Sequence, residues 1–155
     1  MYYCFVYPYL QYCNEVWGNA YPTHLKRLTL LQKRVIRIIA KVDKFYPTDE
    51  LFVKFKILKF HNINNYMIGQ VMYKAFWVLL PKPVQNMFIK NAQIHSHNTR
   101  QSNDFHFPKP KTNLLKKSIA FKGVHIWNSI RQNISINCTY DRYKKRLKNV
   151  YLNMT

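Results

Sequence analysis

The chain has 155 residues, of which 48% are hydrophobic and 16% aromatic, so it can build a core and is not an intrinsically disordered chain. It carries 25 Lys and Arg against six Asp and Glu, a formal charge of +19, which makes an anionic partner the leading expectation. Two-metal phosphoryl transfer needs several carboxylates close together, and the chain is poorly equipped for it because no carboxylate occurs between Glu50 and Asp104. Its three glycines are too few for a phosphate-cradling loop or a dinucleotide fingerprint.

The three cysteines, Cys4, Cys13 and Cys138, are an odd number without short paired spacing. This argues against a disulfide framework and a zinc module, so we expect reduced, mostly buried thiols, no metal and no cofactor. The N-terminus lacks the basic head and cleavage site of a signal peptide. The most apolar run, residues 67–80, is shorter than the ~20 residues that span a bilayer. We therefore expect an intracellular protein, in the cytoplasm or the nucleus, without a membrane partner or a small-molecule substrate.

Residues 1–17 are aromatic and apolar with almost no charge, and they are predicted to be helical. Asn14, Gly18 and Asn19 close the segment with turn chemistry. Because it begins on bulky residues without a polar lead-in or a cap, the chain looks cut from a longer polypeptide, in which Met1 was an internal methionine.

The segment from Leu25 to Val42 predicts an amphipathic helix, with Pro22 in its first turn. Its apolar arc consists of Leu28, Leu31, Val35, Ile38, Ile39 and Val42. Its basic arc consists of Lys26, Arg27, Lys33, Arg34, Arg37 and Lys41. No carboxylate occurs in the segment, so the apolar arc should dock on a core and the basic arc should face an anion.

The middle of the chain predicts a short helix over residues 49–58, capped by Thr48, and a long central helix over residues 61–80. Prolines end the long helix, and residues 84–90 can add one or two turns. A polar stretch follows, and then a basic segment near the C-terminus.

Residues 91–113 are polar, His-rich and interrupted by prolines, which is typical of an exposed loop. His95 and His97 suggest a metal or nuclease site, but Asp104 is the sole carboxylate nearby. We therefore interpret His95, His97 and Arg100 as polar contacts, either to phosphate or to their own loop, and a self-sufficient nuclease stays a minor alternative.

Residues 114–121 alternate weakly and allow a short strand pair near Ile119, which Gly123 should break. A helical pattern follows over residues 124–131, and Thr139 should cap a last helix with an aromatic and aliphatic stripe. Basic residues of this region are Lys116, Lys117, Arg142, Lys144, Lys145, Arg146 and Lys148.

The predicted fold is mainly α, a helical, bundle-like single domain with a long polar loop and at most a short strand pair. Basic segments interleaved with aromatic residues fit RNA or DNA, through phosphate contacts and base stacking. A membrane surface is a weaker candidate, because the apolar stripes are needed for the core. The predicted nucleic-acid-binding residues are Lys26, Arg27, Lys33, Arg34, Arg37, Lys41, His97, Arg100, Lys116, Lys117, Arg142, Lys144, Lys145, Arg146 and Lys148.

The order of several short segments resembles a known family. These segments are YPYLQYC over residues 7–13 with VWG over 16–18, LLQKRVIRII over 30–39, HNTRQ over 97–101, Gly123 with IWNSI over 126–130, and YKKRLK over 143–148. They are similar, in this order, to the region that follows the polymerase core in non-LTR (LINE-type, jockey-like) retrotransposon reverse transcriptases. The resemblance covers nearly the whole chain.

The resemblance implies the thumb and post-thumb part of such an enzyme, mainly helical, which grips template RNA and primer. Residues 1–90 would be the helical thumb-like region, 91–113 the loop, and 114–155 the C-terminal basic region of the same domain. The family's polymerase site uses a Tyr-x-Asp-Asp turn, and this chain has no Asp-Asp pair, so no catalytic residue is carried over. The chain is therefore not expected to be an enzyme by itself. The alternative is a decayed or repurposed basic domain with a structural or protein-interaction role.

Overall fold

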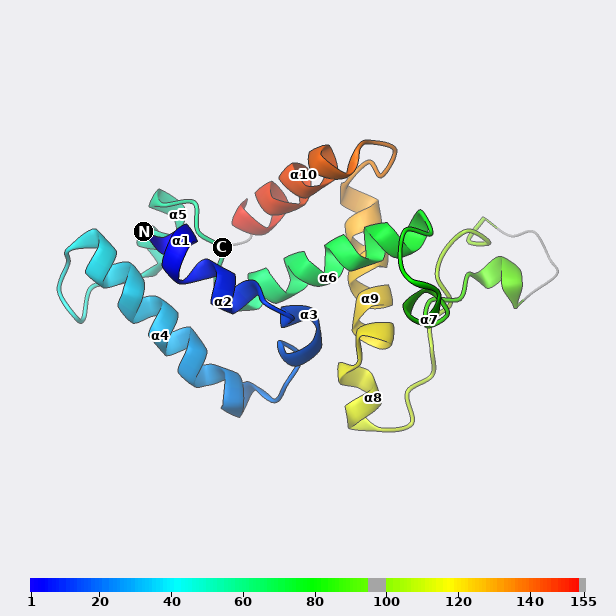
Figure 1. Ribbon diagram of the computed structural model, residues 1–155, viewed down its shortest axis with the longest axis horizontal. Helices are drawn as coiled ribbons and strands as arrows, with labels where there is room; N and C mark the ends of the chain where they lie inside the picture. Colours follow the sequence, from blue (N-terminus) through cyan, green and yellow to red (C-terminus); the bar gives the residue numbers. More distant parts are fainter. Residues whose placement is uncertain (95–99, 154–155) are drawn as a thin grey trace. The chain divides into compact units, whose positions relative to one another are not determined.

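A computed structural model describes residues 1–94 and 100–153 of the chain (Figure 1). These residues form ten α-helices, α1 to α10, and one 3₁₀ helix, η1. The mainly helical fold predicted from the sequence is confirmed. The short strand pair is wrong, because the described residues contain no strand and only one isolated antiparallel bridge, between Lys90 and Phe105.

The chain divides into two compact units, which are described separately here. Unit 1 comprises residues 1–67 and 144–155, and unit 2 comprises residues 68–143. The division falls inside α6 (Phe60–Phe76) and α10 (Tyr140–Asn153), and it does not coincide with the sequence-based boundaries at residues 90 and 113. That the chain folds as one domain stays a prediction.

Unit 1 begins with three short helices in place of one longer helix. They are α1 (Tyr2–Phe5), α2 (Tyr7–Gln11) and α3 (Asn14–Trp17). Pro8 lies in the first turn of α2, where a missing backbone N–H costs no helical hydrogen bond, so a new helix has to begin there. Cys13 has a left-handed backbone with φ of 48°, which separates α2 from α3.

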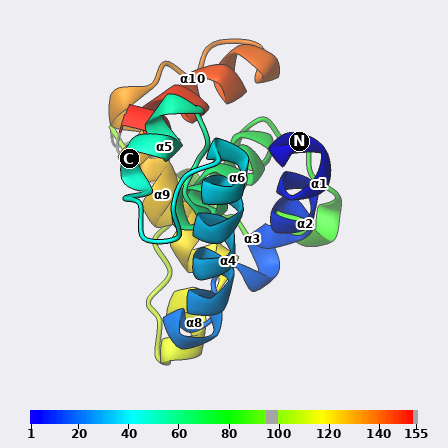
Figure 2. The ribbon, with the colours of Figure 1, turned by 90° about the vertical axis from the view of Figure 1, so that its left-hand side faces the viewer.

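The basic helix is α4 (Pro22–Ala40), and it lies beside α1 and α2 in both views (Figures 1 and 2). Pro22 occupies its first turn, as predicted. The helix ends two residues before the predicted Val42, because Lys41 adopts a left-handed backbone with φ of 54°. The Val42 N–H then donates to the Arg37 carbonyl, which closes the last turn. Helix α5 (Asp49–Lys54) begins after Thr48 as expected, but the Thr48 side chain makes no capping hydrogen bond, and the helix ends before the predicted residue 58.

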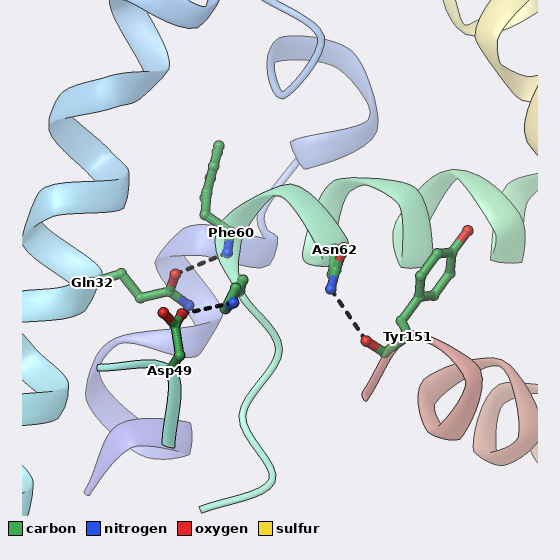
Figure 3. Close-up of polar contacts among 6 residues, drawn as sticks. Gln32, Asp49, Phe60, Asn62 and Tyr151 are labelled. Carbon is green, nitrogen blue, oxygen red and sulfur yellow. Dashed lines mark hydrogen bonds and ion pairs between the residues drawn. The ribbon is translucent and has the colours of Figure 1, made fainter. Parts of the chain in front are cut away.

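A buried glutamine joins three parts of unit 1. The Gln32 side chain of α4 donates from Nε2 to the Tyr2 hydroxyl at 2.7 Å and to the Leu58 carbonyl at 2.9 Å. Its Oε1 accepts from the N–H of Phe60, the first residue of α6, at 2.8 Å (Figure 3). Gln32 thus supplies a partner for one of the N–H groups that every helix start leaves unpaired.

Unit 1 also contains a buried pair of asparagines. The Asn64 side chain of α6 donates to Asn14 Oδ1 at 2.9 Å, and Asn14 Nδ2 donates to the Leu10 carbonyl at 2.8 Å. Gly18 packs against this pair so closely that a Cβ there would lie 2.5 Å from the Asn14 backbone oxygen. The same end of α6 receives α10, where Asn62 donates to the Tyr151 carbonyl at 3.1 Å (Figure 3).

Unit 2 contains the end of α6, α7 (Lys82–Gln85), η1 (Asn91–Gln93), α8 (Asn113–Lys117), α9 (Ile119–Asn133) and the start of α10. Its core is aromatic: Trp127 and Tyr143 are fully buried, and the Tyr143 ring stacks on Tyr73 with centroids 4.5 Å apart. Phe105 is also buried, so residues 91–113 are anchored at this point and are not exposed throughout.

The region predicted as a strand ended by a glycine is helical. Thr112 and Ser118 accept hydrogen bonds from the Leu115 and Phe121 N–H groups through their hydroxyl oxygens, so each caps a helix, α8 or α9. These two local caps outweigh the weak alternation in the sequence. Gly123 lies inside α9, where it permits close packing: a Cβ would lie 2.7 Å from Met72 Sδ of α6.

Candidate nucleic-acid interface

Helix α4 presents most of its predicted basic arc to solvent. Lys26, Arg27, Arg34 and Lys41 are exposed. Lys33 and Arg37 are half-buried. The helix and its C-cap contain no carboxylate, so no acid on the same element neutralises these charges.

The buried face of α4 is not the predicted apolar arc. Gln32 and Ile36 are its buried residues, whereas Leu31 and Ile38 are 51% and 66% exposed. The predicted arc is therefore wrong in part, because burial is centred on a polar residue whose amide caps α6. Hydrophobic periodicity assigns no weight to such a residue, so it places the buried face too far toward Leu31 and Ile38.

Because the buried face of α4 differs from the predicted one, apolar side chains of the helix are exposed next to its cations. A surface hollow of about 730 Å³ follows the last turns of the helix and the turn after it. It is lined by Leu30, Arg34, Arg37, Ile38, Val42, Lys44 and Phe45. Its apolar and cationic walls come from one continuous stretch of sequence.

Two of the predicted α4 contacts have neighbours inside the protein. The pKa of the Asp49 carboxyl lies below its ordinary value, through the hydrogen bond and the charge of Lys59 at 2.7 Å, with a smaller contribution from the Lys33 charge. Arg37 donates from Nε to the Tyr46 carbonyl at 2.9 Å, which leaves its terminal nitrogens for other partners. Lys33 is therefore less suited to an external anion than its exposed neighbours.

In unit 1, α10 adds a second basic surface. Of the aromatic and aliphatic stripe predicted for this helix, Leu147 and Tyr151 are buried in unit 1 and Val150 is half-buried. Lys145 and Arg146 are exposed, and Lys144 and Lys148 are half-buried. Lys148 Nζ lies 3.2 Å from the Tyr3 hydroxyl and 5.0 Å from the ring centroid, so part of its role is to hold α10 against α1.

The remaining predicted contacts belong to unit 2. Arg100, Lys116 and Arg142 are exposed, Lys117 is half-buried, and His97 lies outside the described residues. They belong to a different unit from α4, which lies in unit 1. Lys122 belongs to the same basic segment as Lys116 and Lys117 but is not among the predicted contacts; it is half-buried, and burial lowers its pKa from 10.5 to about 8.

Unit 2 also has a polar hollow of about 570 Å³ beside α9. Its lining includes Asn91, Gln101, His106 and Asn128. Arg131 of α9 forms an ion pair with Asp104 at this hollow. Asp104 of the loop is thus held by α9, while His95 and His97 lie outside the described residues.

The described residues offer few acidic partners to the cations. Among the cations, Lys59 forms an ion pair with Asp49 and Arg131 forms one with Asp104. No three His, Cys, Asp or Glu side chains in residues 1–94 and 100–153 gather closely enough to hold a metal ion. Cys4 and Cys13 are exposed and Cys138 is half-buried, so the expectation of mostly buried thiols is wrong.

None of the helices in the described part of the chain has both the length and the apolar composition needed to cross a bilayer. Compared with known protein families, with curated proteins and with solved structures, the chain gives no match.

Proposed function

We propose that the chain binds RNA or DNA through the phosphate backbone, as the C-terminal portion of a non-LTR retrotransposon reverse transcriptase that has no catalytic activity of its own. The observation that carries the proposal is the exposed, acid-free basic surface of α4. An RNA or DNA backbone supplies the regularly spaced negative charge that this surface lacks within its own helix.

The dimensions of α4 support a contact with several phosphates. At about 1.5 Å per residue, Lys26 and Lys41 lie roughly 22 Å apart along the helix, which is several times the spacing of phosphates on one strand. Arg27 and Arg34 lie between them and are also exposed. Lys145 and Arg146 of α10 provide further exposed cations in the same unit. An intracellular location, in the cytoplasm or the nucleus, accompanies this function.

Replacement of Arg27, Arg34 and Lys41 by Ala tests the proposal. The affinity for an RNA or DNA oligonucleotide should fall, and the slope of log K against log salt should become shallower by about 0.7 to 0.9 for each lost phosphate contact. Fluorescence anisotropy at several salt concentrations measures both quantities.

A control variant removes the same charge elsewhere. Lys54, Lys109 and Lys111 are exposed lysines outside α4, and their replacement by Ala lowers the net charge equally. An α4 variant that keeps the wild-type slope, or that changes it no more than this control, would contradict the proposal. The reverse-transcriptase origin is tested separately by the genomic sequence upstream of Met1, which should encode an in-frame Tyr-x-Asp-Asp polymerase.

A protein-interaction role is the second candidate, and a specific surface favours it. The short N-terminal helices expose large apolar side chains, with Phe5 at 70%, Tyr9 at 80%, Tyr12 at 77% and Val16 at 76%. Large apolar side chains that are exposed on neighbouring short helices are typical of surfaces that another protein covers. If this role is the main one, replacement of Tyr9 and Tyr12 by Ser should abolish capture of a protein partner. In the wild type, the slope of log K against log salt for oligonucleotides should then be close to zero.

A further inference from the structure

An exposed aromatic ring lies at the end of the basic helix. Phe45 lies in the turn after α4, five residues beyond the last helical residue, and is 82% exposed, more than any other phenylalanine among the exposed residues of the described chain. Phe45 and Ile38 lie on the same hollow, whose cationic wall includes Arg34 and Lys44. The ring therefore combines an open aromatic face with nearby positive charge.

The turn that carries Phe45 is held by hydrogen bonds. The Asp43 carboxylate accepts from the Phe45 N–H at 2.9 Å, and the Asp43 carbonyl accepts from the Tyr46 N–H at 3.1 Å. Arg37 of α4 donates to the Tyr46 carbonyl at 2.9 Å, which ties the far side of the turn to the helix. A partner that stacks on Phe45 therefore has little backbone ordering to impose.

Cations surround the ring on the side of the hollow. Lys44 Nζ lies 5.4 Å from the centroid of the Phe45 ring. Arg34 and Arg37 line the same hollow from one turn of α4. The Asp43 carboxylate is the acid of this turn, and its Oδ1 already accepts the Phe45 N–H. An aromatic ring next to excess positive charge can bind a ligand that carries both a planar aromatic group and a negatively charged group.

We propose that this hollow binds single-stranded nucleic acid, with one base stacked on Phe45 and the adjoining phosphates on Arg34, Arg37 and Lys44. The inference rests on the proposed function and names the strand state that unit 1 prefers. A base in a duplex is stacked on its neighbours and cannot offer its face to the ring, whereas a single strand can. The hollow of about 730 Å³ lies in the size range of small-molecule sites, which is room enough for one base.

Replacement of Phe45 by Ala separates stacking from charge. Affinity for a single-stranded oligo-dT or oligo-U should fall about fivefold or more, because the loss of one base–aromatic stack has at least this effect. The salt slope should stay unchanged because no cation is removed, and affinity for a duplex of equal length should not fall. Phe45→Leu, which retains an apolar side chain, should lose as much as Phe45→Ala.

Phe5→Ala is the matched control, because Phe5 is an exposed phenylalanine of the same unit that lies outside the hollow. It should bind the single strand as the wild type does. Circular dichroism of each variant establishes that the helices are retained. Equal loss in Phe5→Ala and Phe45→Ala would overturn the proposal.

Phe45→Trp adds a direct signal. The indole should be quenched by oligo-dT but not by inorganic polyphosphate, which has the charge without the bases. Quenching or an equal spectral shift with polyglutamate or with anionic vesicles would overturn the proposal in favour of an acidic protein or a lipid surface. If the wild type binds no oligonucleotide, the proposed function fails. If the wild type binds and Phe45→Ala binds equally well, the proposed function stands and this inference fails.

Discussion

Removal of the Gln32 side chain should destabilise unit 1 strongly, although it is a polar residue on a basic helix. Gln32 is 2% exposed and makes three hydrogen bonds, at 2.7, 2.9 and 2.8 Å. In Gln32→Ala, the Leu58 carbonyl and the Phe60 N–H become buried groups without this partner. Each such group costs about 1–3 kcal/mol, so we expect a loss of about 3 kcal/mol or more.

The measurement combines urea denaturation with amide hydrogen exchange. The free energy of unfolding should fall by the stated amount in Gln32→Ala, and the Phe60 amide should lose its protection against exchange. Gln11→Ala, which truncates a half-buried glutamine of α2, should have a much smaller effect. If the Phe60 amide stays protected in Gln32→Ala, another group caps α6 and the reasoning is refuted.

A double-mutant cycle isolates one bond of the three. Tyr2→Phe removes the hydroxyl that accepts from Gln32 Nε2, which should cost about 1 kcal/mol. In the Gln32→Ala background the same change should cost less, because the bond is already lost. Full additivity of the two effects would show that the Tyr2 hydroxyl and Gln32 do not act on stability together.

Three further substitutions test the packing of the two units, one in unit 1 and two in unit 2. Gly18→Ala should lower the free energy of unfolding, measured by urea denaturation, by at least about 2 kcal/mol, because the added Cβ would lie 2.5 Å from the Asn14 backbone oxygen. Gly123→Ala should change it by less, since the added Cβ meets a flexible methionine side chain and alanine has the higher helix propensity. Equal losses in the two variants would contradict this distinction. Lys122→Met should stabilise unit 2 by roughly 1 kcal/mol at pH 7, because burial disfavours the charged lysine and lowers its pKa from 10.5 to about 8. In the wild type, the folded state releases the Lys122 proton above about pH 8 and the unfolded state above about pH 10.5, so the wild type becomes more stable as the pH rises through this range. The difference in free energy of unfolding between Lys122→Met and the wild type should therefore shrink over that range, and a difference that does not depend on pH would count against the argument.

The mainly helical fold, the extent of α4 and the start of α10 could be predicted from the sequence. Proline is tolerated in the first turn of a helix but disrupts its interior, so Pro22 marks the start of α4. Thr139 precedes the last helix, as expected. The exposed cations of α4 were also predictable, since Lys and Arg are seldom fully buried. These features depend on local chemistry, so neighbouring residues are enough to determine them.

The sequence was less informative where two distant residues meet. Gly123 is predicted to end a short strand, but it lies in α9, where its missing side chain makes room for Met72. The weak alternation before it indicates a strand, whereas the Thr112 and Ser118 caps favour helices. A glycine has the same letter whether it ends a strand or permits close packing inside a helix, and only the position of α6 distinguishes the two.

For α4, the sequence by itself determined that one long helix would have an acid-free basic surface, because charge and helix propensity are properties of the residues. Only the tertiary structure decided which face is buried. The start of α6 needs a hydrogen-bond acceptor, and Gln32 provides it, so the helix is turned with this polar residue inward and Ile38 outward. That rotation creates the hollow next to Phe45, because the satisfaction of one buried N–H outweighs the burial of one more aliphatic side chain.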